Sequence, residues 1–427
     1  MECSGCDLTM RWRSFKRKFF IHFANTSISA TTYTNKSVTY DNNRQLKIVI
    51  APDSYKESLS ALEVATQIEL GFKDIFPDAE YVKVPMADGG EGTVQAMIEA
   101  TQGRRIEVDV TDPLGQTISS FYALTGDGRT AMIEMAAASG LALVPTAQRN
   151  PEVTSSYGTG ELIAAALNAG ARHLILGIGG SATNDGGAGM LQALGVQLLD
   201  AAGHSIGPGG APLAQLARID VAGMDARLLE CTIEVACDVD NPLTGERGAS
   251  AIFGPQKGAT PAMVQTLDAN LKHFAQLIQR DLGVDVDQVP GAGAAGGMGA
   301  AMLAFLKGQL RPGCEIIAKA VGLDAAVQDA DWVITGEGRI DQQTIFGKTP
   351  FGVATVARKH GKPVIGIAGS LGANAQAVHD HGIDAIFSVL SRPCTIQDAV
   401  AEAEHNVRTT ARNVAALLAM GQRSAKA

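Results

Sequence analysis

Residues 173–193 read His-Leu-Ile-Leu-Gly-Ile-Gly-Gly-Ser-Ala-Thr-Asn-Asp-Gly-Gly-Ala-Gly-Met-Leu-Gln-Ala. The apolar run 173–178 predicts a buried strand, residues 177–189 a flexible loop, and the pattern from Met190 the start of a helix. Glycine N–H groups can approach an anion closely, and a helix N-terminus adds partial positive charge, so this order is typical of a phosphate site. Asp185 does not fit, because its carboxylate repels a phosphate unless a metal ion or a substrate proton stands between them.

The composition is that of a large globular enzyme of two or three domains, with 427 residues, 46% of them hydrophobic, and 48 glycines. The net charge is −9, and no basic stripe is interleaved with aromatic residues, so we expect no nucleic-acid partner. No run reaches the roughly 18 apolar residues of a membrane helix, so we expect no membrane partner. Only Cys3 and Cys6 form a C-x-x-C pair, and the scattered cysteines predict a reducing compartment, the cytoplasm.

The first 45 residues differ from the rest of the chain. They hold seven basic and three acidic residues and a run rich in Ser, Thr and Asn. This composition offers too little apolar surface to build a core. We therefore predict that residues 1–45 are a disordered extension.

Strand-loop-helix units recur near both ends of the chain, where buried strand patterns begin at Lys47, Trp332, Val364 and Ala385. Between about residues 104 and 135 apolar and polar residues alternate instead, and turn sequences separate the runs, which predicts an antiparallel meander. We therefore predict an α/β fold. Residues 46–105 and 290–427 form a discontinuous Rossmann-like domain with a parallel sheet, and residues 106–289 form an inserted α/β domain that contains antiparallel strands.

Two nucleotide-binding motifs were considered. The sequence Gly347-Lys-Thr349 resembles the end of a P-loop, but Gln342 stands where the first glycine of that loop is required, so a Walker A motif is absent. Residues 177–182 match the dinucleotide fingerprint G-x-G-x-x-A, and Asp200 lies about 20 residues further on, as a ribose-binding acid would. An NAD-dependent oxidoreductase therefore remains an alternative, and a sugar-acid binding protein without catalytic activity is a third hypothesis.

Charged residues follow several predicted strand ends, in loops that also hold glycines or turn residues. These loops are residues 53–56, 88–93, 185, 238–241 and 336–341. Several carboxylates with a few cations and no nucleophilic triad suit metal-assisted phosphoryl transfer, in which Mg²⁺ neutralises the phosphates of ATP and one Asp accepts the hydroxyl proton.

From Lys47 onward the chain resembles the type I glycerate kinases of bacteria. The motifs that carry the resemblance are Ile50-Ala-Pro-Asp-Ser-Tyr-Lys-Glu-Ser, Met86-Ala-Asp-Gly-Gly-Glu-Gly-Thr, Gly158-Thr-Gly, Gly179-Gly-Ser-Ala-Thr-Asn-Asp-Gly-Gly, Cys237-Asp-Val-Asp-Asn-Pro-Leu, Phe253-Gly-Pro-Gln-Lys-Gly-Ala, Thr335-Gly-Glu-Gly-Arg-Ile-Asp and Gly347-Lys-Thr-Pro. The resemblance implies ATP-dependent, Mg²⁺-requiring phosphorylation of D-glycerate at the 2-hydroxyl, in glyoxylate or sugar-acid breakdown. It also implies a two-domain fold with a discontinuous Rossmann-like part. Phosphorylation of the 3-hydroxyl and a homodimer remain open.

The family pattern begins near Leu46, where a methionine would stand, and residues 1–45 have no counterpart in it. We expect translation to start at Leu46, because a leucine codon can act as an initiator in bacteria. N-terminal sequencing of protein expressed from its own gene tests this, and a chain that starts at Met1 would contradict it.

The family motifs do not assign individual roles, so we assign them on chemistry. Asp185 and Asp88 are the candidate bases, Arg339 is the candidate cation for a carboxylate or phosphate, and Asp238 and Asp240 are the candidate Mg²⁺ ligands. We expect Asp185→Asn to leave the fold intact and to lower kcat by about 10²-fold or more. The candidate substrate- or nucleotide-binding residues are Asp53, Ser54, Lys56, Gly89, Gly90, Glu91, Gly92, Thr93, Gly158, Thr159, Gly179, Gly180, Ser181, Asn184, Glu337, Asp341 and Lys348.

Overall fold

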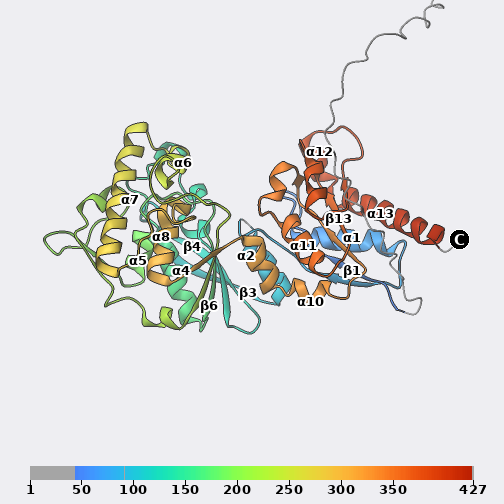
Figure 1. Ribbon diagram of the computed structural model, residues 1–427, viewed down its shortest axis with the longest axis horizontal. Coiled ribbons are helices and arrows are strands. Elements are labelled where there is room, and N and C mark those ends of the chain that lie inside the picture. Colours follow the sequence, from blue (N-terminus) through green and yellow to red (C-terminus); the bar gives the residue numbers. More distant parts are fainter. Residues whose placement is uncertain (1–43, 91, 426–427) are drawn as a thin grey trace, which may run out of the picture. The chain divides into compact units, whose positions relative to one another are not determined.

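The computed structural model describes residues 44–90 and 92–425 (Figure 1). The predictions made for residues 1–43, for the Cys3 and Cys6 pair and for Glu91 lie outside the described residues. From Gln45 onward the contacts between elements join the chain into one compact unit.

The two ends of the described chain build one parallel sheet, as predicted. Its five strands run in the order β15-β13-β11-β1-β2. The strands are β1 (Lys47–Ile50), β2 (Glu80–Lys83), β11 (Trp332–Thr335), β13 (Val364–Ala368) and β15 (Ala385–Ser388), and each pairs in parallel with its neighbours.

Both faces of this first sheet are buried. In β1, Ile48 and Ile50 pack on one face with helices α1 (Ala61–Lys73) and α13 (Ala403–Ala425), which lie side by side (Figure 1). Val49 points to the other face, because side chains alternate along a strand. That face is covered by α2 (Thr93–Thr101), α9 (Gly313–Ala320), α10 (Leu323–Val327) and α11 (Thr349–Lys359).

Helix α1 begins where the sequence provides a capping box. The Ser60 hydroxyl accepts a hydrogen bond from the Glu63 N–H, and the Glu63 carboxylate accepts one from the Ser60 N–H. Helix α12 (Ile396–Ala401) follows the last strand and leads into α13.

The second sheet is mixed, with six strands in the order β10-β9-β6-β5-β4-β3. The strands are β3 (Arg104–Thr111), β4 (Thr117–Leu124), β5 (Thr130–Glu134), β6 (His173–Gly177), β9 (Thr232–Ala236) and β10 (Gln309–Arg311). The pairs β3 with β4 and β4 with β5 are antiparallel, which confirms the predicted meander. The pairs β5 with β6, β6 with β9 and β9 with β10 are parallel.

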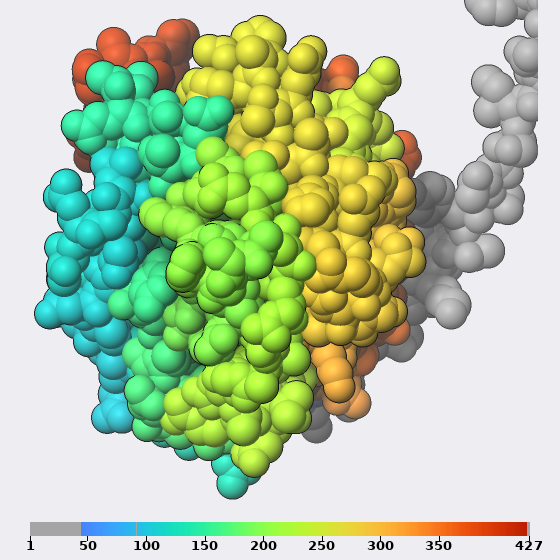
Figure 2. All heavy atoms as spheres, turned by 90° about the vertical axis from the view of Figure 1, so that its left-hand side faces the viewer, coloured from blue at the N-terminus to red at the C-terminus, as the bar shows by residue number. Residues whose placement is uncertain are grey.

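Helices pack on the second sheet in one large hydrophobic core. They are α3 (Ala136–Ser139), α4 (Tyr157–Asn168), α5 (Ala188–Ala193), α6 (Ala249–Phe253), α7 (Pro261–Leu282) and α8 (Ala294–Leu306). Figure 2 shows a face of this part, on which the green segment after β6 lies beside the yellow helix α7. The Asp281 carboxylate ties them together by accepting a hydrogen bond from the Ile219 N–H.

Two short sheets complete the described fold. Strands β7 (Gln197–Leu199) and β8 (Arg218–Asp220) pair antiparallel, and β12 (Arg339–Ile340) pairs in parallel with β14 (Ser370–Leu371). The segment after β14 is a 3-10 helix (Ala375–His381).

The chain crosses from the first sheet to the second and back, and the return lies later than we predicted. We placed it at residue 290, but α8 packs in the core of the second sheet and β10 pairs with β9. The membership of the strands puts the return after Arg311. The division into two domains remains a proposal.

No helix in the part of the chain that the structure describes is both long and apolar enough to cross a membrane.

Candidate active site

Loops from both sheets meet around a pocket of about 340 Å³, which we call the charged pocket. Its lining includes Lys56, Asp88, Gly179, Ser181 and Asp238. These residues follow strands β1, β2, β6 and β9, each of which pairs in parallel within its sheet. The pocket therefore lies beyond the carboxyl ends of parallel strands, where open α/β sheets bind their ligands.

Asp88 is held in place by close packing of the backbone. Its carboxylate accepts a hydrogen bond from the Gly90 N–H at 3.0 Å. Behind it, a Cβ atom at position 313 would lie 1.8 Å from the Asp88 carbonyl oxygen, so only glycine fits there. The start of α9 therefore supports the loop that presents Asp88 to the pocket.

The negative charge of Asp88 interacts electrostatically with the carboxyl groups of Asp53 and Asp238. Burial raises the pKa of Asp53 to about 7, and the charge of Asp88 adds to this rise. The pKa of Asp238 is raised to about 6 because the surrounding protein displaces water from its carboxyl group, although the residue is exposed, and the charge of Asp88 contributes again. Asp88 is therefore the common neighbour of two carboxyl groups that gain from a nearby cation.

Fixed donors orient the other two carboxylates. Asp53 accepts a hydrogen bond from the Thr349 hydroxyl at 2.6 Å, at the start of α11, and another from the Ser54 N–H at 2.6 Å. Asp238 accepts one from the Gly313 N–H at 3.1 Å.

Glu337, Lys348 and Thr344 form a second polar group next to Asp53. The Lys348 ammonium donates to the Glu337 carboxylate at 3.1 Å, and the Thr344 hydroxyl donates to it at 2.6 Å. Burial raises the pKa of Glu337, against the effect of these two donors. The charge of Glu337 in turn contributes to the raised pKa of Asp53, which places this group beside the charged pocket.

The loop quoted first forms the opposite wall of the charged pocket. Gly179 and Gly180 are exposed, whereas Ser181 is almost fully buried. The Leu141 N–H donates to the Gly180 carbonyl at 2.8 Å, and the Ala182 N–H donates to the carbonyl of residue 139 at 2.9 Å. The loop is thus pinned from the side of α3 while its glycine backbone faces the pocket.

Asp185 is placed differently from our expectation of a catalytic base. Its side chain is fully buried and is not among the residues that line the charged pocket. The carboxylate accepts hydrogen bonds from the N–H and the hydroxyl of Ser156 at 2.9 and 2.7 Å, and from the Gly187 and Gly189 N–H groups at 3.1 Å each. With its oxygens engaged in this way, Asp185 holds the loop to α4 and α5. We no longer propose it as the base.

Arg339 and Asp240 also lie away from the charged pocket. The exposed Arg339 pairs with Asp341 at 3.2 Å, and Asp341 caps a 3-10 helix (Gln342–Ile345) by accepting from the Gln343 N–H. The exposed Asp240 pairs with Arg247 at 2.7 Å. We no longer propose Arg339 as a catalytic cation or Asp240 as a metal ligand.

Three further candidates have packing roles. A Cβ atom at Gly158 would lie 2.1 Å from the Thr111 carbonyl oxygen, and the hydroxyl of Thr159 is hydrogen-bonded to that of Ser139 at 2.7 Å in the interior. The fully buried Asn184 donates to the Ser250 hydroxyl at 2.9 Å.

The remaining candidates flank the charged pocket. Ser54 and Gly92 line an adjoining hollow of about 350 Å³, which shares Lys56 with the charged pocket. Gly89 and Gly90 lie in the charged pocket itself. The buried Thr93 donates from its hydroxyl to the Gly90 carbonyl at 2.6 Å, which ties the first residue of α2 to the loop before it.

Several lining residues escaped the sequence analysis. Phe253 and Gln256 belong to a motif that we noted without assigning it a role, and Ala294 and Ala295 open α8. A Cβ atom at Gly296 would lie 1.9 Å from the carbonyl oxygen of residue 183, which explains the glycine-rich stretch there. These motifs were visible in the sequence, but nothing in it showed that they meet the loop 179–183.

A family model described as the glycerate kinase family matches residues 48–419. The chain belongs to the glycerate kinase family. The glycerate 2-kinase of Escherichia coli (strain K12) is 60% identical to it over 380 residues, which cover 89% of this chain and 100% of that protein. The glycerate kinase of Bacillus subtilis (strain 168) is 58% identical over 377 residues, which cover 88% and 99%.

A solved structure agrees with the fold of this glycerate kinase family member. The crystal structure of a Salmonella typhimurium LT2 protein ascribed to glycerate kinase 2 matches with a TM-score of 0.83 and 63% identity. The match covers 89% of this chain and 100% of that one. With matches this long and this close, the chain is an enzyme of the family and shares its mixed α/β fold.

The dinucleotide interpretation does not fit this family member. Helix α5 begins only at Ala188, eleven residues after β6 ends, whereas the fingerprint opens a helix directly. The next strand, β7, pairs with β8 in a separate sheet instead of lying beside β6. Asp200 then lies in a turn, where its carboxylate accepts from the Ala202 and His204 N–H groups.

The donor set of the charged pocket suits Mg²⁺, although the structure carries no metal. Carboxylate oxygens are the ligands that Mg²⁺ prefers, and it is commonly held by one or two carboxylates together with substrate phosphates. Among the described residues no group of three or more His, Cys, Asp or Glu side chains is close enough to hold an ion by itself. The raised pKa values of Asp53 and Asp238 are nevertheless those of carboxyl groups that a cation would stabilise in ionised form.

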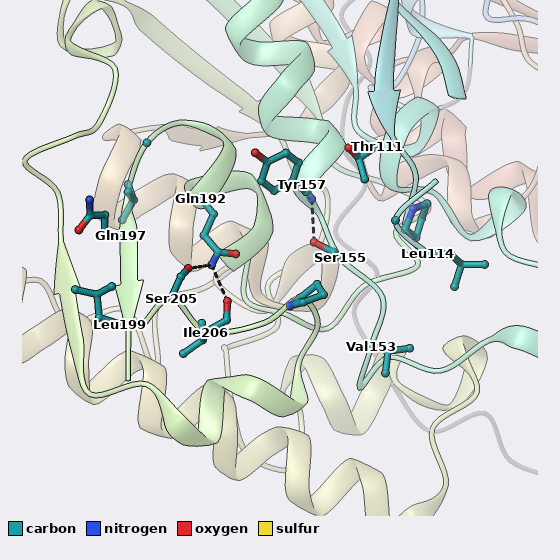
Figure 3. Close-up of a pocket in the computed structure, with 15 residues that line it drawn as sticks. Thr111, Leu114, Val153, Ser155, Tyr157, Gln192, Gln197, Leu199, Ser205 and Ile206 are labelled. Carbon is teal, nitrogen blue, oxygen red and sulfur yellow. Dashed lines mark hydrogen bonds between the residues drawn. The ribbon is translucent and has the colours of Figure 1, made fainter. Parts of the chain in front are cut away.

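A second pocket, of about 830 Å³, lies around Tyr157 and is larger than the charged pocket. Figure 3 shows Tyr157, Gln192, Leu199 and Val153 around it. No charged side chain is among the described residues that line it, so we call it the uncharged pocket. Gln192 donates to the Ser205 hydroxyl and to the Ile206 carbonyl, both at 3.1 Å, within its wall. Nothing in this lining balances the charge of an anionic substrate.

Proposed function

We propose that the chain transfers the γ-phosphoryl group of ATP to the 2-hydroxyl of D-glycerate and releases 2-phosphoglycerate and ADP. The observation that carries this proposal is the charged pocket, whose lining combines Asp88 and Asp238 with Lys56 and exposed glycines in a member of the glycerate kinase family. The choice of the 2-hydroxyl rests on the 60% identity to the E. coli protein named glycerate 2-kinase.

Asp88 is the proposed general base. It lies in the pocket, in the loop between β2 and α2, where Gly313 packs against its backbone and the Gly90 N–H donates to its carboxylate. A carboxylate in this position accepts the proton of the substrate hydroxyl as the hydroxyl oxygen attacks phosphorus.

Asp238, which lines the charged pocket, and Asp53, which is not among its lining residues but interacts with Asp88, are the proposed Mg²⁺ ligands, together with phosphate oxygens of ATP. When bound, the ion neutralises phosphate charge during transfer. The two side chains are pre-oriented by Thr349 and by the Gly313 N–H, so little rearrangement is needed to present their oxygens.

Lys56 and the loop 179–181 are the proposed anion-binding groups. The exposed Lys56 reaches the pocket from the loop after β1, and its charge offsets that of a phosphate or of the substrate carboxylate. Lys348 donates to Glu337, so we propose that it offsets the negative charge of Glu337 next to Asp53 and does not bind the substrate directly.

The experiment is to incubate the purified chain with ATP, Mg²⁺ and D-glycerate and to identify the product by phosphorus NMR. ADP release that depends on D-glycerate, with a 2-phosphoglycerate resonance, is expected. A 3-phosphoglycerate product would overturn the regiochemistry. ATP turnover that does not depend on glycerate would overturn the proposal. Oxidation of D-glycerate with reduction of NAD⁺ to NADH would equally overturn it.

A cytoplasmic location and a homodimer remain proposals. The four cysteines in the described part of the chain are free, in agreement with a reducing compartment. Cell fractionation and light scattering on the purified protein test the location and the assembly.

A further inference from the structure

Lys257 is a fully buried lysine that lies directly behind the charged pocket. It ends a 3-10 helix (Pro255–Lys257) in the motif that supplies Gln256 to the pocket lining. Its ammonium donates to the Ser181 hydroxyl at 2.7 Å and to the Thr183 carbonyl at 2.5 Å. Burying a lysine carries a large desolvation cost, so a lysine in such a place needs a specific reason.

The positive charge of Lys257 is partly offset by the negative charge of Asp185. Burial lowers the pKa of Lys257 to about 7, and the negative charge of Asp185 works against this shift. Asp185 is itself tied to Ser156 and to the start of α5. Lys257 and Asp185 therefore hold the loop 181–185 from within the protein.

The hydrogen bond to Ser181 has a chemical consequence. Below a pH of about 7 Lys257 is mainly an ammonium, whose nitrogen is a donor only, and in that form the Ser181 oxygen acts as the acceptor in this contact. The Ser181 hydroxyl hydrogen is then left for another acceptor, and among the described residues none receives it. Ser181 lines the charged pocket beside the exposed backbone of Gly179 and Gly180.

We propose that Lys257 is a positioning residue that makes the Ser181 hydroxyl a dedicated hydrogen-bond donor to an anionic oxygen bound in the charged pocket. The ammonium fixes the serine rotamer from behind and polarises its O–H bond. The oxygen belongs to a phosphate of the nucleotide or to the carboxylate of the substrate, which share this chemistry. The inference rests on the proposed function for the identity of the anion, but not for the coupling of the two residues.

The test is a double-mutant cycle with Ser181→Ala, Lys257→Met and the double variant, measured at pH 6, where Lys257 is mainly in its ammonium form. Each single variant should lower kcat/KM by about 10-fold to 10²-fold, which is the value of a hydrogen bond to a charged group. Because Lys257 acts through Ser181, the kcat/KM of the double variant should be no more than about threefold below that of the less active single variant. Lys257→Gln, whose amide still donates, should recover part of the loss.

The KM values distinguish the two sources of the anion. A rise confined to the KM for ATP assigns the oxygen to a phosphate, and a rise confined to the KM for D-glycerate assigns it to the carboxylate. Lys272→Met is the matched control, because Lys272 is a half-exposed lysine whose ion pair with Asp287 lies outside the charged pocket. Its kinetic constants should stay within about twofold of those of the unmodified chain.

Two results would overturn the inference. One is a double variant whose loss is the product of the two single losses. The other is a Lys257→Met protein that is less stable but keeps both KM values. Calorimetric binding of ADP and of D-glycerate to the same variants needs no turnover, so it tests the coupling even if the unmodified chain fails to phosphorylate glycerate. If Lys257→Met does not fold, Lys257→Gln takes its place in the cycle.

Discussion

The buried Asp185 interacts with residues next to both the charged pocket and the uncharged pocket, but the linings of the two pockets differ in charge. Asp185 interacts with Lys257 behind the charged pocket, and it accepts hydrogen bonds from Ser156, whose two chain neighbours line the uncharged pocket. The uncharged pocket has more than twice the volume, about 830 against about 340 Å³. Among the described residues that line the two pockets, carboxylates and a lysine occur in the smaller one alone. For a reaction between anions, the charge of the lining identifies the site better than its size does.

The strongest test of this comparison is Asp88→Asn. An amide cannot accept the hydroxyl proton, so we expect kcat to fall by about 10³-fold, while circular dichroism stays unchanged. Steady-state kinetics with ATP and D-glycerate measure the effect. Asp240→Asn is the control, because that exposed residue pairs with Arg247 away from the charged pocket, and the kcat of the variant should remain within about twofold. A near-normal kcat for Asp88→Asn would remove Asp88 from the chemistry.

Asp185→Asn tests the structural role of the buried Asp185, which contacts Ser156 and interacts with Lys257. The substitution turns an amide NH₂ toward N–H and O–H donors and leaves Lys257 without its counter-charge, so we expect the free energy of unfolding to fall by about 3 kcal/mol. This replaces the expectation from the sequence that the fold stays intact. Urea unfolding measures the change, with Asp200→Asn in an exposed turn as the control. If Asp185→Asn keeps full stability but loses kcat, the structural role is wrong.

Asp53→Asn tests the electrostatic repulsion between Asp53 and Asp88, which lines the charged pocket. The pKa of Asp53 is about 7 when folded and near 3.8 when unfolded, so the folded state binds this proton more tightly and the residue costs stability as the pH rises through this window. In EDTA, the variant should be more stable by about 2 kcal/mol at pH 8 and by less at pH 5. Urea titrations at the two pH values measure this. An equal gain at both would contradict the raised pKa.

Val153→Ser tests the uncharged pocket and should have the smallest effect. The side chain is half exposed at the rim of that pocket, so the loss of stability should be below about 0.5 kcal/mol. We expect kcat and both KM values to stay within about twofold. A tenfold rise in either KM would show that a substrate enters the uncharged pocket, and it would reverse the comparison.

Much of the fold follows from local patterns in the sequence. The continuous apolar run Ile48-Val49-Ile50 predicts a strand that is buried on both faces in a parallel sheet, and the structure confirms it. The meander between residues 104 and 134 is equally legible from its alternation. The return crossing near residue 290 was misplaced, because β10 is three residues long and its pairing with β9 leaves no pattern in the local sequence.

The candidate site divides in the same way. Asp88, Asp238, Lys56 and the glycine loop could be found because charged and glycine residues stand directly after predicted strands. The loops at Arg339 and Asp240 carry the same signal, yet these side chains point to solvent and pair locally. A sequence shows which residues follow a strand, but it does not show which of them a neighbouring loop buries.

The sequence by itself determined the fold class, the family and the set of strand-end loops from which a phosphoryl-transfer site could be built, because these depend on periodicity and on long ordered motifs. Only the tertiary structure decided which carboxylates face the pocket. It buried Asp185 under four donors and brought Lys257 to Ser181 from 76 residues away. The physical reason is that hydrogen-bond satisfaction and charge burial depend on contacts between distant segments, and these contacts exist only once the chain is folded.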